Sequence, residues 1–477
     1  MSSAPDRIAP VLGGFAARLT LKDVPPDVGL RARHLMLDAI GCALAARRED
    51  FATRFSASLF SLANSTSGLS GSGLSGVIGF KQGLPLRDAA FLNGILAHGL
   101  DYDDTHMDGI AHLSVSALPA ALAVVAQREG SGADLLAAYI AALETGARLA
   151  RVVKGGFTAR GFHPTALVGT FSSALAAGKG MGLNTAQLVH AQGLALSMAG
   201  GSLQFLEDGS WTKRMHPGWA AQAGITAAHF AAHDIPAPAA PYEGRYGLYR
   251  THLSDAQYEA ADMTFATQGL SAQGQATQWE LLNIAVKPFP MCHFVHASID
   301  AAIALHAQGL HHDDIERVDV WVPQGVVQSV CEPVAQKRRP VSDYDAKFSL
   351  PYAVASGLLR GRLGLAELEP AAYQDPVVLA LMDRIHYEVD PDSTFPRHYS
   401  GEVRVVLKDG HTMQRREAVN RGHPERQLTN EQVAHKFFQN AARHFSDAHA
   451  KAIHTAVVGL DQLQNVRELE RLLAQDP

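Results

Sequence analysis

Apolar residues recur at helical spacing through the first half of the chain. Between residues 28 and 48 they return in steps of three and four, as at Leu37, Ile40 and Leu44, which is the period of one face of an α-helix. Residues 86–235 are rich in Ala, Leu and Gly with the same spacing. Because small side chains let helices approach closely, this pattern predicts a large all-helical bundle.

The pattern changes near Ser271, and residues 279–289 read as an extended segment. Alternating apolar and polar residues are typical of half-buried strands. They predict strands at residues 315–322, 385–389 and 401–408. The dipeptide Asp409-Gly410 follows the last of these, and it is a strong signal for a hairpin turn.

A helical pattern returns after Leu428. We therefore expect a mainly α fold, with a large all-helical domain and a smaller α+β domain. Residues 1–270 would form the first part of the helical domain and residues 271–427 the α+β domain. Residues 428–477 would be helices that return to the helical domain.

Composition and charge narrow the class of protein. The chain has 477 residues and a formal net charge of −6, so no basic surface for nucleic acid is expected. Its three cysteines, Cys42, Cys292 and Cys331, are far apart, which argues against a disulfide framework or an iron–sulfur cluster. The first ten residues do not resemble a secretory signal, and no apolar run of about 18 residues occurs. We expect a cytoplasmic protein that does not enter membranes.

Residues 71–76 match the pattern GxGxxG. A dinucleotide site needs a strand before this motif and a helix that opens within it. Here a Ser/Gly-rich loop precedes the match and the apolar residues 77–80 follow it. We therefore reject a nucleotide-binding interpretation.

Two polar clusters stand out from these apolar surroundings. The first begins at Asn93 and His98 and continues with Asp101, Asp103, Asp104, Thr105, His106 and His112. The second is the segment 161–165 around His163. Such groups are costly to bury unless they are paired or bind a ligand. They are also the groups that move protons to and from carbon. The cations Lys213 and Lys287 follow later in the chain, and together these residues suggest a site for a small, multiply anionic substrate.

The three aspartates of the first cluster allow three interpretations. They could cap a turn, they could bind Mg²⁺, or one of them could orient a histidine. The histidines that follow favour a proton-transfer site over a metal site, so we expect no metal. His163 precedes Pro164, which is typical of a helix start, and helix N-termini attract anions. Lys213 and His216 are three residues apart and could share a helix face.

Four motifs, in order along nearly the whole chain, resemble the MmgE/PrpD family. They lie at residues 92–105, 161–165, 213–221 and 287–296. The family includes 2-methylcitrate dehydratase, cis-aconitate decarboxylase and iminodisuccinate epimerase. The resemblance implies a large helical domain with a smaller α+β lid domain, a homodimer, and catalysis without a cofactor or metal.

The resemblance also implies a set of site residues. Matched motif by motif, these are Asp101, Thr105, His112, His163, Lys213, Lys287 and Tyr352. His106 competes with His112 for its role, and His216 and Cys292 are further candidates for contact with the substrate. One position departs from the cis-aconitate decarboxylases, which have a histidine five residues after the lysine of the fourth motif, where this chain has Cys292.

The named members all act at a carbon next to a carboxylate. The resemblance therefore implies that Lys213 and Lys287 neutralise the developing dianion, and that Thr105 and Tyr352 hydrogen-bond its carboxylates. His163 and His112 would be the general base and acid. Asp101 would orient a histidine or fix its tautomer.

From these residues we expect a cofactor-free lyase of a small di- or tricarboxylate, most simply a dehydratase like 2-methylcitrate dehydratase. An epimerase like iminodisuccinate epimerase and a decarboxylase of cis-aconitate are alternatives, because the same groups serve all three reactions. A non-catalytic carboxylate-binding protein is an alternative of another class, since a fold alone never proves activity. A metal-dependent hydrolase is a third option, which sensitivity to a chelator would reveal.

Overall fold

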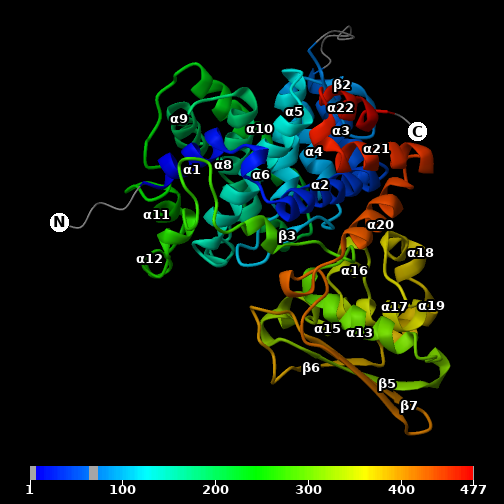
Figure 1. The fold of residues 1–477 in the computed structure, drawn as a ribbon. Coiled ribbons are helices and arrows are strands. Elements are labelled where there is room, and N and C mark those ends of the chain that lie inside the picture. Colours follow the sequence, from blue (N-terminus) through cyan, green and yellow to red (C-terminus); the bar gives the residue numbers. More distant parts are fainter. Residues whose placement is uncertain (1–6, 64–72, 476–477) are drawn as a thin grey trace. The chain divides into compact units, whose positions relative to one another are not determined.

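The computed structural model describes residues 7–63 and 73–475. It divides into two compact units, one made of residues 1–284 with 429–477 and the other of residues 285–428. The sequence placed these divisions at 270/271 and 427/428. The mainly α fold with a smaller α+β part is confirmed (Figure 1). In the part of the chain that the structure describes, no helix is long and apolar enough to cross a membrane.

The larger unit is a bundle of helices. From the first segment these are α1 (Ile8–Arg18), α2 (Pro26–Ala46), α3 (Asp50–Ala63), α4 (Leu86–His98), α5 (Ser114–Gln127), α6 (Gly132–Arg151), α8 (Pro164–Met181), α9 (Thr185–Leu196) and α10 (Thr212–Ala232), with the short α7 (Gly156–Ala159), α11 (Leu248–His252) and α12 (Asp255–Glu259). From the end of the chain come α20 (Asn430–Ala441), α21 (Asp447–Val458) and α22 (Arg467–Leu473). Helices α20 and α21 pack against α2 (Figure 1), so the last segment returns to the first.

Three short strands also occur in this unit: β1 (Ser75–Val77), β2 (Phe80–Leu84) and β3 (Thr105–His106). Strands β1 and β2 pair in an antiparallel hairpin, which occupies the end of the rejected GxGxxG match. Residues 71 and 72 of that match lie outside the described residues. No helix opens within the described part of the match, 73–76.

Small residues bring α4 and α10 into backbone contact. A Cβ atom added to Gly94 would lie 2.6 Å from Cα of Gly218, and one added to Gly218 would lie 2.2 Å from the backbone oxygen of Phe91. Helix α10 also packs against α5, α8 and α9. As a result, the end of α4 and the start of α10 lie close together, and both carry polar residues of the predicted site.

The smaller unit is built on one four-stranded sheet in the order β6-β5-β7-β8. Its strands are β5 (Ile315–Val322), β6 (Ile385–Val389), β7 (Gly401–Leu407) and β8 (Thr412–Glu417). Strand β5 is parallel to β6 and antiparallel to β7. The expected hairpin joins β7 to β8, and Gly410 in its turn has φ of +87°, a conformation that suits glycine.

The smaller unit also contains seven helices within the described residues. They are α13 (His296–His306), α14 (Val327–Val330), α15 (Val334–Lys337), α16 (Asp343–Lys347), α17 (Leu350–Arg360), α18 (Pro370–Tyr373) and α19 (Pro376–Met382). Of these, α13 and α17 contact the sheet. Helix α13 packs against α17, β7 and β8. Inward-facing residues such as Val318, Val320 and Val403 complete an apolar core with them.

One predicted element is wrong in part. Residues 279–289 were expected to be extended, but Glu280–Asn283 form a 3₁₀ turn before the two-residue strand β4 (Ile284–Ala285). The Glu144 carboxylate accepts the backbone N–H groups of Glu280 at 3.0 Å and Leu281 at 2.8 Å. Successive N–H groups of a strand point to opposite sides, so one carboxylate can bind both only where the chain turns.

Candidate active site

Four imidazoles gather where helices of the larger unit begin and end. His98 ends α4, His112 precedes α5, His163 is the N-cap of α8, and His216 lies in the second turn of α10. Their exposed fractions are 9% or less. The ring centroid of His98 lies 4.8 Å from that of His112 and 5.6 Å from that of His163. The ring centroids of His163 and His216 are 5.2 Å apart. A buried group of this kind has to be satisfied by hydrogen bonds or by a ligand.

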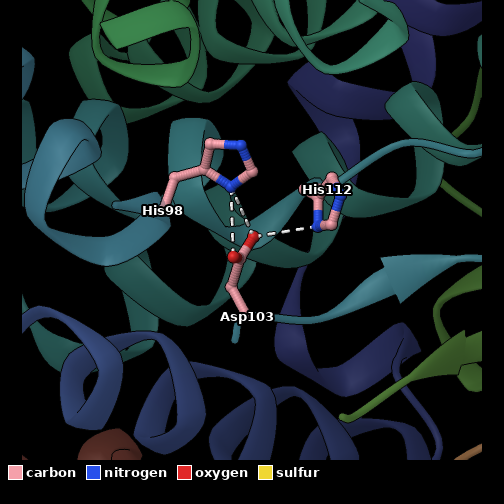
Figure 2. A group of neighbouring side chains, drawn as sticks. All are labelled: His98, Asp103 and His112. Atoms are coloured by element: carbon pink, nitrogen blue, oxygen red, sulfur yellow. Dashed lines mark hydrogen bonds and ion pairs between the residues drawn. The ribbon is translucent and has the colours of Figure 1, made fainter. Parts of the chain in front are cut away.

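A fully buried carboxylate joins two of these imidazoles (Figure 2). Nδ1 of His98 lies 3.1 and 3.0 Å from the two oxygens of Asp103, and Nδ1 of His112 lies 3.0 Å from one of them. Burial alone would raise the pKa of Asp103, but the charge interactions and hydrogen bonds with His98 and His112 hold it well below its usual range. Asp103 is therefore an anion shared by two imidazoles.

The aspartates on either side of Asp103 have different partners. Asp101 forms an ion pair with Nζ of Lys213 at 2.8 Å, and its φ of +54° lies in the left-handed region that a non-glycine residue rarely adopts. Asp104 accepts hydrogen bonds from the hydroxyl and the backbone N–H of Ser114. Burial raises the pKa of Asp104 to about 7. The three neighbouring carboxylates thus bind different partners, which are a lysine, two histidines and the first residue of α5.

The second pair of imidazoles is His163 and His216. Their Nδ1 atoms lie 3.0 Å apart, so one ring donates its proton to the other. Among the described residues, no carboxylate has a hydrogen bond with either ring. Burial lowers the pKa of His163 well below its ordinary value and that of His216 to about 4. Both rings are therefore neutral near pH 7.

Local structure explains why His163 is held there. The His163 backbone N–H donates to Gly201 O at 2.9 Å, and Pro164 occupies the first helical position of α8, where its missing N–H costs nothing. The helix start expected from the sequence at Pro164 is confirmed. The ring of Phe205 lies edge-on to His163 and His216 and gives the pair an apolar neighbour.

Lys213 supplies the positive charge of the cluster. It lies in the first turn of α10, three residues before His216, and 14% of its side chain is exposed. Its charge is one of the causes that lower the pKa values of His98, His163 and His216. A partly accessible ammonium beside neutral imidazoles suits an anionic ligand.

The structure separates the two histidines that competed for one role. His112 lies in the cluster, and the hydroxyl of Thr105 is 3.4 Å from its Nδ1. His106 instead has Nε2 3.3 Å from Glu280 and accepts the N–H of Gly109 at Nδ1. Burial would raise the pKa of Glu280, but its hydrogen bond with His106 and further partners lower it to about 2.

Three predicted residues lie in the smaller unit. Tyr352 is fully buried, and its hydroxyl donates to the backbone oxygen of Glu367. Burial raises the pKa of Tyr352 to about 12. Cys292 and Lys287 are also buried, at 8% and 3% exposed. The roles of these three residues stay predictions.

His98 and Asp103 are absent from the predicted set, although both lie within the first motif. Two signals were available: His98 ends a helix, and a carboxylate follows it five residues later. The sequence did not show that neighbouring aspartates have different partners, because those partners depend on how the chain turns at Asp101.

His98, Asp103 and His112 each offer one metal-ligand atom, and these atoms lie within 4.8 Å of one another. His398, His423 and Glu425 of the smaller unit form a similar group. In the first group the separations near 3.0 Å are ordinary N–H···O hydrogen-bond lengths. Hydrogen bonding therefore accounts for this arrangement.

The fold and the site define a class of protein: a helical bundle with buried imidazoles near its helix ends, together with a smaller α+β unit. Residues 11–261 match the MmgE/PrpD N-terminal domain, and residues 289–462 match the MmgE/PrpD C-terminal domain. The chain belongs to the MmgE/PrpD family, as the four motifs predicted.

Similar proteins of known name cover nearly the whole chain. The sequence is 28% identical to cis-aconitate decarboxylase of Homo sapiens, over 93% of this chain and 89% of that protein. It is 26% identical to cis-aconitate decarboxylase of Aspergillus terreus, over 99% of this chain and 97% of that protein. It is also 26% identical to cis-aconitate decarboxylase-like protein oryM of Aspergillus oryzae, over 97% of this chain and 96% of that protein.

Proposed function

We propose that this chain is a lyase that transfers protons at a carbon next to a carboxylate of a small di- or tricarboxylate, without a cofactor. The observation that carries the proposal is the presence of two adjacent imidazole pairs of opposite character. His98 and His112 share the Asp103 carboxylate, whereas His163 and His216 have no carboxylate and are kept neutral. Titratable groups whose surroundings push their pKa values apart are typical of acid–base sites.

The two pairs suggest an assignment of roles. His163 is neutral near pH 7, as a general base must be. His112 is assigned as the acid, because its Nδ1 atom lies 3.0 Å from the Asp103 carboxylate, an anion that can compensate an imidazolium. Each such group contributes about 10²- to 10⁴-fold to the rate when it is well placed. Lys213 would stabilise the negative charge that develops on a substrate carboxylate, with Asp101 as its partner in the absence of substrate.

Decarboxylation of cis-aconitate is the first candidate reaction, because similar proteins that align over nearly the whole chain carry that name. In this reaction the bond between carbon and the departing carboxylate breaks, and CO₂ leaves. The electron pair passes into a carbanion that the remaining unsaturated carboxylate stabilises. A proton from the acid, here His112, then completes the product.

Dehydration is the second candidate. It needs both roles, because a base removes the proton next to the carboxylate while an acid protonates the departing hydroxyl group. The presence of two imidazole pairs favours it. So does Cys292, which stands where the decarboxylases of the family have a histidine.

Proton NMR in D₂O with EDTA tests the proposal, using cis-aconitate, 2-methylcitrate, citrate and iminodisuccinate. Loss of CO₂ from cis-aconitate, with deuterium in the product, would support the first candidate. Loss of water from a hydroxy acid, with a new vinylic signal, would support the second. His163→Gln should lower the rate by at least about 100-fold.

Three other results would contradict the proposal, the first two as a whole and the third in part. Deuterium exchange next to a carboxylate without net loss would identify an epimerase. If no substrate reacts but one of them binds, the chain is a non-catalytic carboxylate-binding protein. Activity that EDTA abolishes and Mg²⁺ restores would contradict the cofactor-free part and favour the metal-dependent alternative.

A further inference from the structure

The side chain of His98 is buried more completely than the other three imidazoles of the cluster. It is 1% exposed, and its Nε2 atom is inaccessible and has no hydrogen-bond partner. Its Nδ1 atom is 3.1 and 3.0 Å from the two oxygens of Asp103. His98 therefore holds the carboxylate but has no surface with which to touch a substrate.

His112 approaches the same carboxylate from the other side. Its Nδ1 lies 3.0 Å from Asp103 and 2.7 Å from the backbone oxygen of Asp104, while 7% of the residue stays exposed. The carboxylate and the carbonyl can only accept, and the Thr105 hydroxyl 3.4 Å away can also accept, so Nδ1 carries the proton. Nε2 of His112 is then the atom that is free to exchange a proton with a ligand.

We infer that Asp103 and His98 are positioning residues. Asp103, together with the backbone oxygen of Asp104, fixes the Nδ1–H tautomer of His112. Asp103 also offers the anion that compensates an imidazolium, and His98 keeps Asp103 in place. The inference rests on the proposed function in one respect, since it assumes that His112 transfers the proton. Fixing the tautomer of an imidazole through its second nitrogen is a known way to set which atom reacts.

Sharing one carboxylate between two imidazoles also limits their charge. A single anion compensates one imidazolium, and a second would be a buried charge without a partner. Burial lowers the pKa of His98 in spite of Asp103, and Lys213 and His112 lower it further. The shared carboxylate therefore accommodates one imidazolium at most, and the lowered pKa makes His98 a neutral donor to it.

The local backbone is built to present Asp103 in this way. The Asp101 N–H donates to His98 O at 2.8 Å, which closes a tight turn with φ of +54° at Asp101. Nζ of Lys436 donates to the backbone oxygen of Tyr102 at 2.7 Å. The residues before Asp103 are thus tied both to α4 and to α20.

The test compares Asp103→Asn with a control in the same loop, Asp108→Asn. The side chain of Asp108 is 60% exposed, so the control should behave like the unchanged protein. Asp103→Asn should lower kcat by at least about 100-fold with little change in KM. With ¹⁵N-labelled histidine, the Nδ1–H signal of His98 should give way to mixed tautomers in D103N alone, whereas Nδ1 of His112 keeps the backbone oxygen of Asp104 as an acceptor.

A second pair of variants separates positioning from proton transfer by His98 itself. His98→Gln keeps an N–H donor for Asp103, whereas His98→Leu removes it. H98Q should keep kcat within about 10-fold, and H98L should lose at least about 100-fold. Equal losses in the two variants would contradict the role given to His98. This comparison also keeps the inference testable if D103N does not fold.

The tautomer measurement needs no substrate, so it distinguishes failure of this inference from failure of the proposed function. If no carboxylate reacts but D103N alone disturbs the imidazole signals, the positioning role stands and the proposed reaction does not. Unchanged signals in D103N, or a kcat within threefold of the unchanged protein, would overturn the positioning role of Asp103.

Discussion

At the scale of single residues, three aspartates of the site differ in their properties because each has a different partner. Asp101 faces a lysine, Asp103 faces two imidazoles, and Asp104 faces a serine. Their environments push the pKa values of Asp103 and Asp104 in opposite directions. One short segment therefore holds a permanent anion next to a carboxyl group that titrates near neutral pH.

The pKa of Asp104 predicts how stability depends on pH. It is about 7 in the folded chain against the ordinary value of 3.8. Between these values the folded state keeps a proton that the unfolded state has released, so the contribution of Asp104 to stability falls as pH rises from about 4 to 7. Its full size is on the order of 4 kcal/mol.

Asp104→Asn should remove this contribution. We expect the difference in unfolding free energy between D104N and the unchanged protein to shift in favour of D104N as pH rises from 4 to 7. Urea unfolding at several pH values measures it. His216, whose pKa is lowered, contributes with the opposite sign below about pH 6.5, but this effect cancels in the difference. A difference that does not vary with pH would contradict the prediction.

At the scale of elements, a buried ion pair connects the start and the end of the larger unit. Nζ of Lys436 in α20 lies 2.6 Å from Asp38 in α2, and it also lies 3.8 Å from the centre of the Tyr102 ring. Burial would lower the pKa of Lys436, but Asp38 raises it above the usual range. Burial in turn raises the pKa of Asp38, and the charge of Lys436 opposes that rise.

Replacing one partner of this pair should lower the free energy of unfolding more than replacing both partners. Lys436→Met leaves Asp38 as a buried charge without a partner, which costs about 3–5 kcal/mol. The double variant D38N/K436M leaves no such charge and should recover most of that loss. Urea unfolding of the two variants and the unchanged protein measures the loss in K436M and its recovery in the double variant. A double variant no more stable than K436M would show that the uncompensated charge is not the cause.

A second prediction concerns the contact between α4 and α10. Gly218→Ala would place a methyl group 2.2 Å from the backbone of Phe91, so the helices must separate. We expect a loss of at least about 2 kcal/mol, together with lower activity, because α10 carries Lys213 and His216. Gly200→Ala is the control, since a Cβ atom there meets nothing within 4 Å. Thermal unfolding that is equal for the two variants would contradict the prediction.

The elements that the sequence predicted well are those set by local periodicity. The strands at 315–322 and 385–389 have the predicted bounds, and the helix start at Pro164 follows from one proline. The site needed more than local information. His163 and His216 are 53 residues apart and Asp38 and Lys436 nearly 400, so no spacing in the sequence revealed these pairs. The motif resemblance supplied His163 and Lys213, but it did not supply Asp103 or His98.

At the scale of the whole molecule, the return of the last segment to the larger unit has a physical basis. Helix α20 begins at a capping box formed by Thr429 and Gln432, which gives a sharp start directly after the smaller unit. Its buried face includes Val433 and Phe437, and these residues need an apolar partner that α2 provides. The helical period after Leu428 predicts helices in this segment, and α20 and α21 pack against α2.

The last prediction is the oligomeric state. Trp219 and Phe230 on α10 are 42% and 40% exposed. They are eleven residues apart, close to three helical turns, so they share one face. Large apolar side chains gathered on one exposed face are typical of an interface, and the family resemblance implies a homodimer. We therefore expect a mass near twice the 51.0 kDa of the chain in light scattering.

Phe230→Glu should shift this dimer toward the monomer, because a charge would be buried at the interface without a partner. Val341→Glu is the matched control, since Val341 is 79% exposed on the smaller unit and the same change there should leave the mass unaltered. Sedimentation of both variants at several concentrations measures the shift. If the protein without substitutions is a monomer, the prediction of a dimer is wrong. A dimer in which F230E and V341E behave alike would instead assign the interface to another surface than the exposed face of α10.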